Sequence, residues 1–266
     1  MPETNCGRVA LITGGSGGIG RATAQMFTAH GFRVYELSRS GGSGGAVTHI
    51  TADVTDEASL AAAFSHVYSL EGRIDVLVNN AGFGIGGAVE HTPLVDMKRQ
   101  FDVNFFGLLA ASKEALPYLR KTGGRIVNVS SVAAVLPVPF QTLYSASKAA
   151  INACTLALRN EVGPLGVSVC AVMPGDVKTG FTTARLMAPT PDGEYGSRIA
   201  RSIATMERDE QNGMPPDLVA RFIYRAATCA RPRPFFVVGT KYRLFALMAK
   251  FLPASLINWL VGRIYG

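Results

Sequence analysis

Residues 9–20 read VALITGGSGGIG, a short apolar run followed by a glycine-rich turn and the opening of a helix. Glycines let a backbone turn tightly and approach a pyrophosphate, and the free N–H groups at a helix N-terminus attract an anion. A glycine-rich string by itself is also compatible with a flexible turn. Its place at the first strand–helix junction predicts a dinucleotide-binding loop made by Gly14, Ser16, Gly18, Ile19 and Gly20.

Short apolar runs alternate with helical periodicity along most of the chain. This alternation predicts a parallel sheet with right-handed crossovers and helices on both faces, which is a doubly wound α/β fold in a single domain. No repeat or linker divides the chain. We expect strands at 8–12, 33–37, 47–50, 74–78, 125–129, 167–172 and 235–238, and helices at 18–30, 55–70, 94–120 and 143–162.

Length and composition exclude several classes of protein. The 266 residues are 48% hydrophobic and 17% charged, which excludes disorder and a small disulfide scaffold. The four cysteines have no metal-binding spacing, and His30, His49, His66 and His91 are scattered, so no metal site is predicted. The chain shows no signal peptide and no apolar run of about 18 residues, so we expect a cytoplasmic protein.

The net charge of +7 is unevenly distributed. Residues 218–266 contain eight Lys or Arg and no Asp or Glu, whereas residues 1–217 contain 18 basic and 19 acidic residues. Because the body of the chain is nearly neutral, the basic balance does not predict nucleic-acid binding.

The end of the second expected strand indicates which nucleotide binds. An acidic residue there would hold the ribose 2′-hydroxyl, whereas a basic one accommodates a 2′-phosphate. Ser38, Arg39 and Ser40 occupy this place, which favours NADP(H) over NAD(H). Glu36 is the counter-argument, but strand alternation should direct it away from the ribose. Asp53, followed by Val54, is placed either to accept from the adenine amino group or to cap the following helix.

A phenol and an ammonium share one helix face at Tyr144 and Lys148, because residues at i and i+4 are neighbours. A cation beside a phenol, assisted by the positive ring of a nicotinamide, lowers the pKa of the phenol, which predicts that Tyr144 is a general acid or base near neutral pH. Ser130 and Ser131 end the strand 125–129, at the carboxyl edge of the sheet where ligands bind.

Taken together, these motifs resemble the classical short-chain dehydrogenase/reductase family, in particular its NADP(H)-dependent members that act on hydroxysteroids and other lipids and carry an apolar C-terminal tail. The resemblance implies a single Rossmann domain, residues 1–239, with a seven-stranded parallel sheet. The matching motifs are TGGSGGIG (13–20), DV (53–54), NNAG (79–82), VN (103–104), SS (130–131), YSASK (144–148) and PGDVKT (174–179).

The resemblance also implies roles for four catalytic residues. Tyr144 is expected to be the acid/base, with Lys148 holding the nicotinamide ribose and lowering the pKa of Tyr144. Ser131 is expected to hydrogen-bond the substrate oxygen, with Ser130 as its structural neighbour. Asn104 is expected to hold a water that relays protons to Lys148, or else to be an amide that kinks the helix or caps the core.

For the cofactor, the resemblance implies contacts along two loops. Asn80, Ala81 and Gly82 are expected along the adenine ribose, while Asn79 ties the central strands. In the second loop, Asp176 is expected to be a loop residue rather than an acid catalyst. The other cofactor contacts implied are Pro174 and Gly175 under the nicotinamide, and Val177 and Thr179 at its carboxamide.

The implied reaction is hydride transfer between the nicotinamide and a carbonyl or secondary alcohol. Substrate choice is expected to depend on a lid at about 181–214. An apolar pocket suits a lipophilic carbonyl or alcohol of hydroxysteroid or lipid type. The alternatives are a 3-oxoacyl-thioester reductase, which would show a basic patch for an acyl carrier, and a non-catalytic NADP(H)-sensing protein. The candidate substrate contacts are Phe83, Val132, Val138, Leu143, Phe181 and Leu186.

The C-terminal tail, residues 240–266, is apolar and carries only basic charges. We expect two short helices broken at Pro253. This composition is typical of a helix that lies on an anionic lipid leaflet, which would place the protein peripherally at the inner face of a membrane. A dimer arm or a lid over the substrate cleft is the alternative. The family resemblance implies a homodimer or homotetramer.

Overall fold

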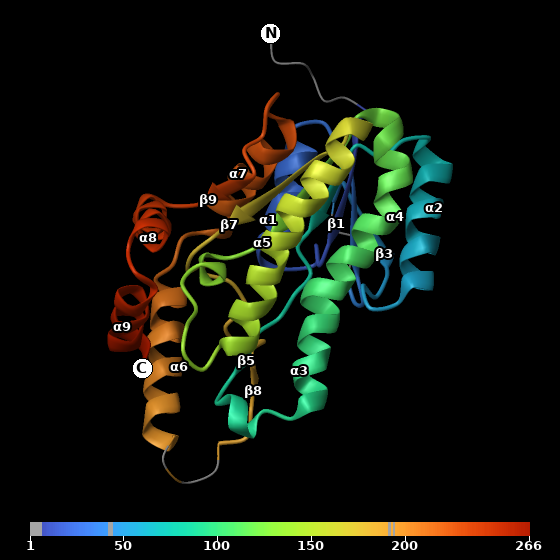
Figure 1. Cartoon of the computed structure of the whole chain (residues 1–266). Coiled ribbons are helices and arrows are strands. Elements are labelled where there is room, and N and C mark those ends of the chain that lie inside the picture. The colour runs from blue at the N-terminus through green and yellow to red at the C-terminus, as the bar shows by residue number, and fades with distance from the viewer. Residues whose placement is uncertain (1–6, 42–44, 191–192, 194) are drawn as a thin grey trace.

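The computed structural model describes residues 7–41, 45–190, 193 and 195–266. Cys6 and residues 191, 192 and 194 of the expected lid lie outside this part of the chain. Seven parallel strands form one sheet in the order β3-β2-β1-β4-β6-β7-β9, with helices on both faces (Figure 1). The strands are β1 (Val9–Thr13), β2 (Arg33–Ser38), β3 (Val47–Thr51), β4 (Val76–Asn79), β6 (Arg125–Val129), β7 (Ser168–Met173) and β9 (Phe235–Val237).

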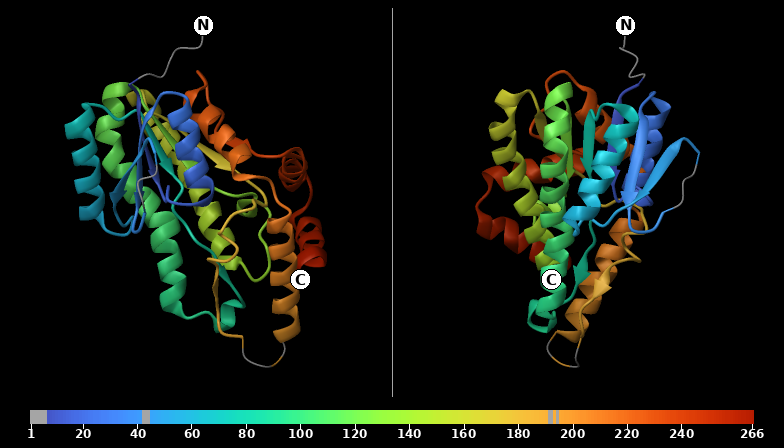
Figure 2. Two further views of the ribbon diagram at one scale, coloured as in Figure 1. Left: turned by 180° about the vertical axis from the view of Figure 1, so that it is seen from behind. Right: turned by 90° about the vertical axis from the view of Figure 1, so that its right-hand side faces the viewer.

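Alternating side chains of each strand pack into two separate apolar layers. Leu11 of β1 faces α2 (Glu57–Glu71) and α4 (Gly107–Thr122), while Ile12 faces α1 (Gly18–Ala29) and α7 (Pro216–Thr228). The period of two residues along a strand produces this division. The two views of Figure 2 show helices on either side of the sheet. The predicted doubly wound fold with a seven-stranded parallel sheet is confirmed.

One helix differs from the sequence expectation. The segment 94–120 is not one continuous α-helix, because a π-helical turn, Asp102–Phe106, separates α3 (Leu94–Phe101) from α4. A π turn inserts an extra residue and is frequent at functional sites. Here it places Asn104 against the loop that follows β4.

Beside the main sheet lie elements that the sequence did not reveal, together with the two C-terminal helices that it predicted. A two-stranded parallel ladder joins β5 (Ile85–Gly86) to β8 (Leu186–Met187). The helix α6 (Gly196–Gln211) follows, and after α7 and β9 come α8 (Thr240–Phe251) and α9 (Ala254–Tyr265), separated by Pro253. The helix α9 packs against α6 at the same end as α8 (Figure 1). Within the described residues, no helix is both long and apolar enough to cross a bilayer.

Candidate active site

A cleft of about 1120 Å³ lies at the carboxyl ends of β1, β4, β6 and β7. Ligands of open parallel sheets bind at this edge. The cleft extends from the glycine-rich turn before α1, past the start of α5 (Thr142–Val162), to the helices α6, α8 and α9. It therefore joins the expected nucleotide end to the expected substrate end.

The glycine-rich turn is shaped by close backbone contacts. Gly14 has a φ of 64°, and a Cβ on Gly20 would lie 2.2 Å from the carbonyl oxygen of Gly14. The Asn80 amide fastens the turn by donating to the carbonyl oxygens of Thr13 and Gly14, at 3.1 and 2.9 Å. Gly17, the N-cap of α1, has no side chain to occupy the helix N-terminus, and the first turn carries no acidic residue. This open N-terminus fits a pyrophosphate.

The members of the turn differ in their access to the cleft. Gly14, Ser16, Gly18 and Ile19 line it, as do Ala81 and Gly82 of the neighbouring strand end. Gly20 does not line the cleft. It packs beneath the turn and supports it.

At the far end of β2, Ser38, Arg39 and Ser40 line the cleft. Glu36 is buried instead beneath the turn, accepts from His49 and from the Ser38 hydroxyl, and does not line the cleft.

Asp53 and Val54 line the same end of the cleft. Asp53 accepts from the backbone N–H and hydroxyl of Thr55, at 2.9 and 2.8 Å, so it is not the helix cap. The cap of α2 is Asp56. Burial raises the pKa of Asp53, but its hydrogen bonds with Thr55 and the charge of Arg39 outweigh this and hold the pKa below its usual value.

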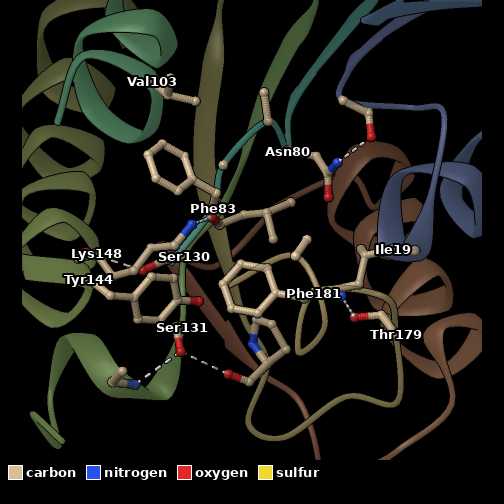
Figure 3. A pocket seen from close by; sticks show the side chains of 18 of the residues that line it. Ile19, Asn80, Phe83, Val103, Ser130, Ser131, Tyr144, Lys148, Thr179 and Phe181 are labelled. Carbon is tan, nitrogen blue, oxygen red and sulfur yellow. Dashed lines mark hydrogen bonds between the residues drawn. The ribbon is translucent and has the colours of Figure 1, made fainter. Parts of the chain in front are cut away.

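Tyr144, Lys148 and Ser131 converge in the middle of the cleft (Figure 3). Tyr144 and Lys148 lie on one face of α5, and Ser131 follows β6. The Lys148 ammonium donates to the carbonyl oxygen of Val129 at 2.8 Å. Ser130 donates to the carbonyl oxygen of Lys148 at 3.2 Å and so fastens the helix to the strand end.

The electrostatics of Tyr144 differ from the sequence expectation. Burial raises the pKa of Tyr144 to about 12, although its hydrogen bond with Ser131 lowers it, and the charges of Glu210 and Asp176 raise it further. Burial also lowers the pKa of Lys148 to about 8. The direction of the Tyr144 shift is opposite to the sequence expectation, which also included the positive charge of a bound nicotinamide ring. The Lys148 ammonium lies 5.6 Å from the centre of the Tyr144 ring and is directed at Val129, and loss of water contact dominates.

Asn104 lies behind the cleft wall and does not line it. Its Oδ1 accepts from the Phe83 N–H at 3.0 Å, and its Nδ2 donates to the Phe83 carbonyl at 2.9 Å and to the Ser147 hydroxyl at 3.2 Å. The π turn and this amide together hold the wall at Phe83 in place. Asn104 therefore lies where the helix is interrupted, and its expected role in holding a water stays a prediction.

The loop after β7 crosses the cleft toward α1. Pro174, Gly175, Val177 and Thr179 all line it, and the Thr179 side chain lies next to Gly18. Asp176 lies in this loop, as expected, but it also has contacts that the sequence did not indicate. It lines the cleft and accepts a hydrogen bond from the hydroxyl of Tyr242 in α8, and burial raises its pKa.

Five of the six candidate substrate contacts line the cleft, namely Phe83, Val132, Val138, Phe181 and Leu186. The rings of Tyr144 and Phe181 lie side by side, with centroids 5.5 Å apart (Figure 3). Leu143 does not line the cleft. It precedes Tyr144 by one residue, and about 100° of helical rotation directs the two side chains to different faces.

The C-terminal tail forms one wall of the cleft. The sequence left three alternatives for the place of this tail: on a lipid leaflet, on a partner subunit or over the cleft. It packs on its own subunit, and the Tyr265 hydroxyl donates to Asp209 of α6 at 3.1 Å. The Tyr242 ring covers Gly175, where a Cβ would lie 2.3 Å from the ring. The tail residues that line the cleft are Lys241, Tyr242, Phe245, Val261, Ile264 and Tyr265.

A group of carboxylates on the substrate side was also missed. Asp209 and Glu210 of α6 line the cleft with Asp176. Glu210 pairs with Arg185 and accepts from Thr182, while burial raises its pKa. Two acids at the end of a polar helix are typical of a solvent-exposed face, so no local pattern indicates their burial. Within the described residues, no three His, Cys, Asp or Glu side chains gather into a metal site.

Comparisons with known proteins agree with this geometry. Residues 8–188 match the family model described as short chain dehydrogenase. The chain is 37% identical to 3-ketodihydrosphingosine reductase of Bacteroides thetaiotaomicron, covering 97% of this chain and 98% of that one. It is 30% identical to NADPH-dependent 3-dehydrocapnine reductase of Ornithobacterium rhinotracheale, covering 94% and 95%. A solved short-chain dehydrogenase of Streptomyces avermitilis is 29% identical, with a TM-score of 0.82 over 96% of this chain and 97% of that one.

Proposed function

The chain belongs to the short-chain dehydrogenase/reductase family, and we propose that it is an NADPH-dependent reductase of a long-chain ketone that carries an amine next to the carbonyl. One observation carries this proposal. The carboxylates of Glu210 and Asp176 line the same cleft as Tyr144, near enough for their charges to raise the pKa of its hydroxyl, and apolar side chains such as Phe181 line that cleft too.

The two carboxylates suit an ammonium at a defined place. A ketone oxygen held by Tyr144 and Ser131 leaves the adjacent carbon, and any amine on it, within a few ångström of the Tyr144 hydroxyl. Burial raises the pKa of both Asp176 and Glu210, because their charged forms have lost part of their hydration. A substrate ammonium beside them replaces that lost stabilisation with a charge-assisted contact.

The names of two relatives support this substrate class. 3-Ketodihydrosphingosine and 3-dehydrocapnine are both long-chain ketones with an amine on the neighbouring carbon. A hydroxysteroid, which the sequence leaves open, has no amine and gains nothing from the carboxylates. An acyl carrier would favour a basic patch, whereas the substrate side contains three carboxylates, Asp176, Asp209 and Glu210, beside Arg185 and Lys241.

Each of the central side chains has a role in this reduction. When bound, the nicotinamide dinucleotide supplies a hydride for the carbonyl carbon. Tyr144 is protonated at neutral pH, since its pKa is raised to about 12, and it gives this proton to the carbonyl oxygen as negative charge develops there. Ser131 donates a second hydrogen bond to that oxygen. Lys148 would hold the ribose hydroxyls of the bound nucleotide, Asn104 positions the wall at Phe83, and the product is a secondary alcohol.

Arg39 supports NADPH over NADH. It is exposed at the end of β2, lines the cleft beside Ser38 and Ser40, and is close enough to Asp53 to lower its pKa. A guanidinium there suits the 2′-phosphate, and Glu36, the acid that would favour NADH, lies outside the cleft. A protein that only senses the nucleotide needs no proton donor, so Tyr144 and Ser131 in the cleft favour an enzyme.

The test is NADPH consumption by the purified protein with substrates that differ in one group. We expect rapid turnover of 3-ketodihydrosphingosine and much slower turnover of its N-acetyl derivative, which keeps the chain and ketone but has no positive charge. A steroid ketone and a 3-oxoacyl thioester complete the panel. Equal rates for the amine and its N-acetyl derivative would contradict the amine preference, and no turnover of any ketone would contradict the reductase itself.

Variants locate the amine contact. Glu210→Gln removes one charge from the cleft, and we expect kcat/KM for the amino ketone to fall about 10- to 100-fold, the range for a hydrogen bond to a charged group. The N-acetyl derivative should change less than about threefold, because it makes no such contact. Glu207→Gln, one turn earlier on α6 and outside the cleft, is the matched control. Tyr144→Phe should abolish turnover while leaving NADPH binding intact.

A further inference from the structure

The helices α8 and α9 have two faces with different surroundings. Their inner face packs toward the cleft and α6 through Tyr242, Phe245, Val261 and Tyr265, all of them half-buried. Their outer face has no partner within the described chain and is rich in large apolar side chains. Six of the sixteen exposed large apolar side chains described lie on these two helices, namely Leu244, Leu247, Phe251, Leu256, Trp259 and Ile264.

The two most exposed of these six side chains are aromatic. Phe251 is 74% exposed and Trp259 is 57% exposed. Exposed apolar residues scattered singly are ordinary, but a concentration of them on one short segment indicates an interaction surface.

The charges on the same two helices are all of one sign. Lys241, Arg243, Lys250 and Arg263 are exposed, and residues 240–266 contain no Asp or Glu. Two of these cations lie beside the apolar residues, since Arg263 is 5.6 Å from the Trp259 ring and Lys250 is 6.0 Å from the Phe251 ring. A long cationic side chain next to an aromatic ring can keep its charge at a polar headgroup while its stem lies along apolar surface.

We propose that this outer face of α8 and α9 docks on an anionic lipid bilayer. The apolar side chains enter the boundary between headgroups and acyl chains, and Lys250 and Arg263, which lie beside Phe251 and Trp259, meet the negative headgroups. The docking does not depend on the proposed reaction.

A second copy of the chain is a poorer partner for this face. A twofold contact between two tails would bring Lys and Arg of one copy against Lys and Arg of the other, and the tail has no carboxylate to compensate them. An anionic leaflet supplies the missing negative charge.

The docked orientation places the cleft next to the lipid. Lys241 and Ile264 are exposed and also line the cleft, so the outer face and the cleft wall share an edge. On the proposed function, a long-chain ketone in the bilayer reaches Tyr144 by passing this edge, without crossing bulk water.

The first experiment measures binding of the full-length protein to vesicles. Trp259 is the only tryptophan of the chain, so its fluorescence reports on the outer face alone. We expect a blue shift and co-sedimentation with phosphatidylcholine vesicles that contain about 30 mol% phosphatidylglycerol, little binding to pure phosphatidylcholine, and partial release in about 0.5 M NaCl. Absence of binding to the anionic vesicles would overturn the proposal.

Variants separate the outer face from the rest of the surface. Leu247→Asp places a carboxylate among the apolar residues, at a side chain that is 54% exposed, and should lower vesicle binding at least about tenfold. Leu70→Asp, at a 60% exposed leucine near the end of α2, is the matched control and should bind like the wild type. Equal losses in both variants would show that added negative charge, and not the outer face, governs binding.

Self-association is the competing outcome. If a second copy covers the outer face, Leu247→Asp will reduce the molar mass measured by light scattering, and Trp259 will already be shifted to the blue without lipid. That result would overturn the lipid proposal. If binding to anionic vesicles is found but no ketone is reduced, the docking stands and the proposed reaction fails, so the two failures are distinguishable.

Discussion

At the scale of single residues, burial controls the chemistry of the cleft more than neighbouring charges do. Tyr144 and Lys148 are adjacent on α5, as the i, i+4 spacing predicts, yet the pKa of the tyrosine is raised and that of the lysine is lowered. Both shifts disfavour the charged form, which is the effect of removing a group from water. A proton donor results, and this suits the direction of ketone reduction.

The buried Lys148 predicts a pH-dependent stability. Its pKa is about 8 in the folded protein, against 10.5 for an ordinary lysine, so between these pH values the unfolded chain binds more protons, and the contribution of Lys148 to stability rises with pH. The free energy of unfolding of the wild type relative to Lys148→Met should therefore increase by about 2 kcal/mol from pH 7 to about 9.5. Urea unfolding of both proteins at the two pH values measures this. A difference that does not change with pH would contradict it.

Arg39 predicts the cofactor preference. On the proposed function Arg39 would face the 2′-phosphate of NADPH. Arg39→Asp removes this cation and introduces repulsion, so we expect the ratio of kcat/KM for NADPH to that for NADH to fall on the order of 100-fold. Steady-state kinetics with both nucleotides provide the measurement. Arg221→Asp, an exposed arginine of α7 outside the cleft, makes the same charge change and should leave the ratio as it is.

At the scale of elements, the turn before α1 depends on one glycine for packing and tolerates change at another. A Cβ on Gly20 would meet the Gly14 carbonyl at 2.2 Å and the Asn80 amide at 2.6 Å, whereas a Cβ on Gly17 meets nothing within 4 Å. Gly17 also has an ordinary φ of −151°. The two glycines are only three residues apart, and the sequence does not indicate which of them has room for a Cβ.

This contrast predicts different effects of alanine. Gly20→Ala should lower the free energy of unfolding by about 1–3 kcal/mol and weaken NADPH binding, because the turn must move away from the added methyl group. Gly17→Ala should leave the unfolding free energy within about 0.5 kcal/mol of the wild type. Chemical denaturation and NADPH titration of both variants test this, and equal destabilisation would show that the contacts around Gly20 adjust freely.

The π turn is a second feature at this scale. The sequence predicts a helix over 94–120, and its periodicity continues through the interruption. Only the contact of Asn104 with the backbone of Phe83, 21 residues earlier, shows why the helix deviates there. The hydrophobic periodicity of a helix does not indicate a contact with a residue so far away in the sequence.

At the scale of the whole molecule, the tail is both a wall of the cleft and a surface of the protein. Tyr242 bonds to Asp176 and Tyr265 bonds to Asp209, so the last 27 residues, 240–266, hold the substrate end together. The nucleotide end of the cleft, at Gly14 and Arg39, lies at β1 and β2. The tail follows β9, which lies on the other side of β1 at the far edge of the sheet.

Removal of residues 240–266 should therefore affect the two ends differently. We expect KM for the long-chain ketone to rise at least about tenfold, while the Kd for NADPH changes less, because the tail contacts the expected nucleotide site at Gly175 and not at Gly14 or Arg39. Substrate kinetics and NADPH titration on the truncated protein measure both. Because truncation exposes apolar surface, Phe245→Ala in the full chain is the second variant, and an unchanged KM in both would contradict the role of the tail.

The sequence by itself determined the architecture and the nucleotide half of the cleft. Alternating strands and helices, the turn at 13–20 and the strand ends at 79–82 and 130–131 are local patterns, and in a parallel sheet all such strand ends meet at one edge. The tertiary structure alone decided the substrate half. It brought Asp176 and Asp209 against the tail, placed Glu210 in the same cleft, directed Leu143 away, and raised the pKa of Tyr144 by burial. The physical reason is that burial and long-range contact are properties of the packed molecule, and local spacing carries no information about which distant segment removes a side chain from water.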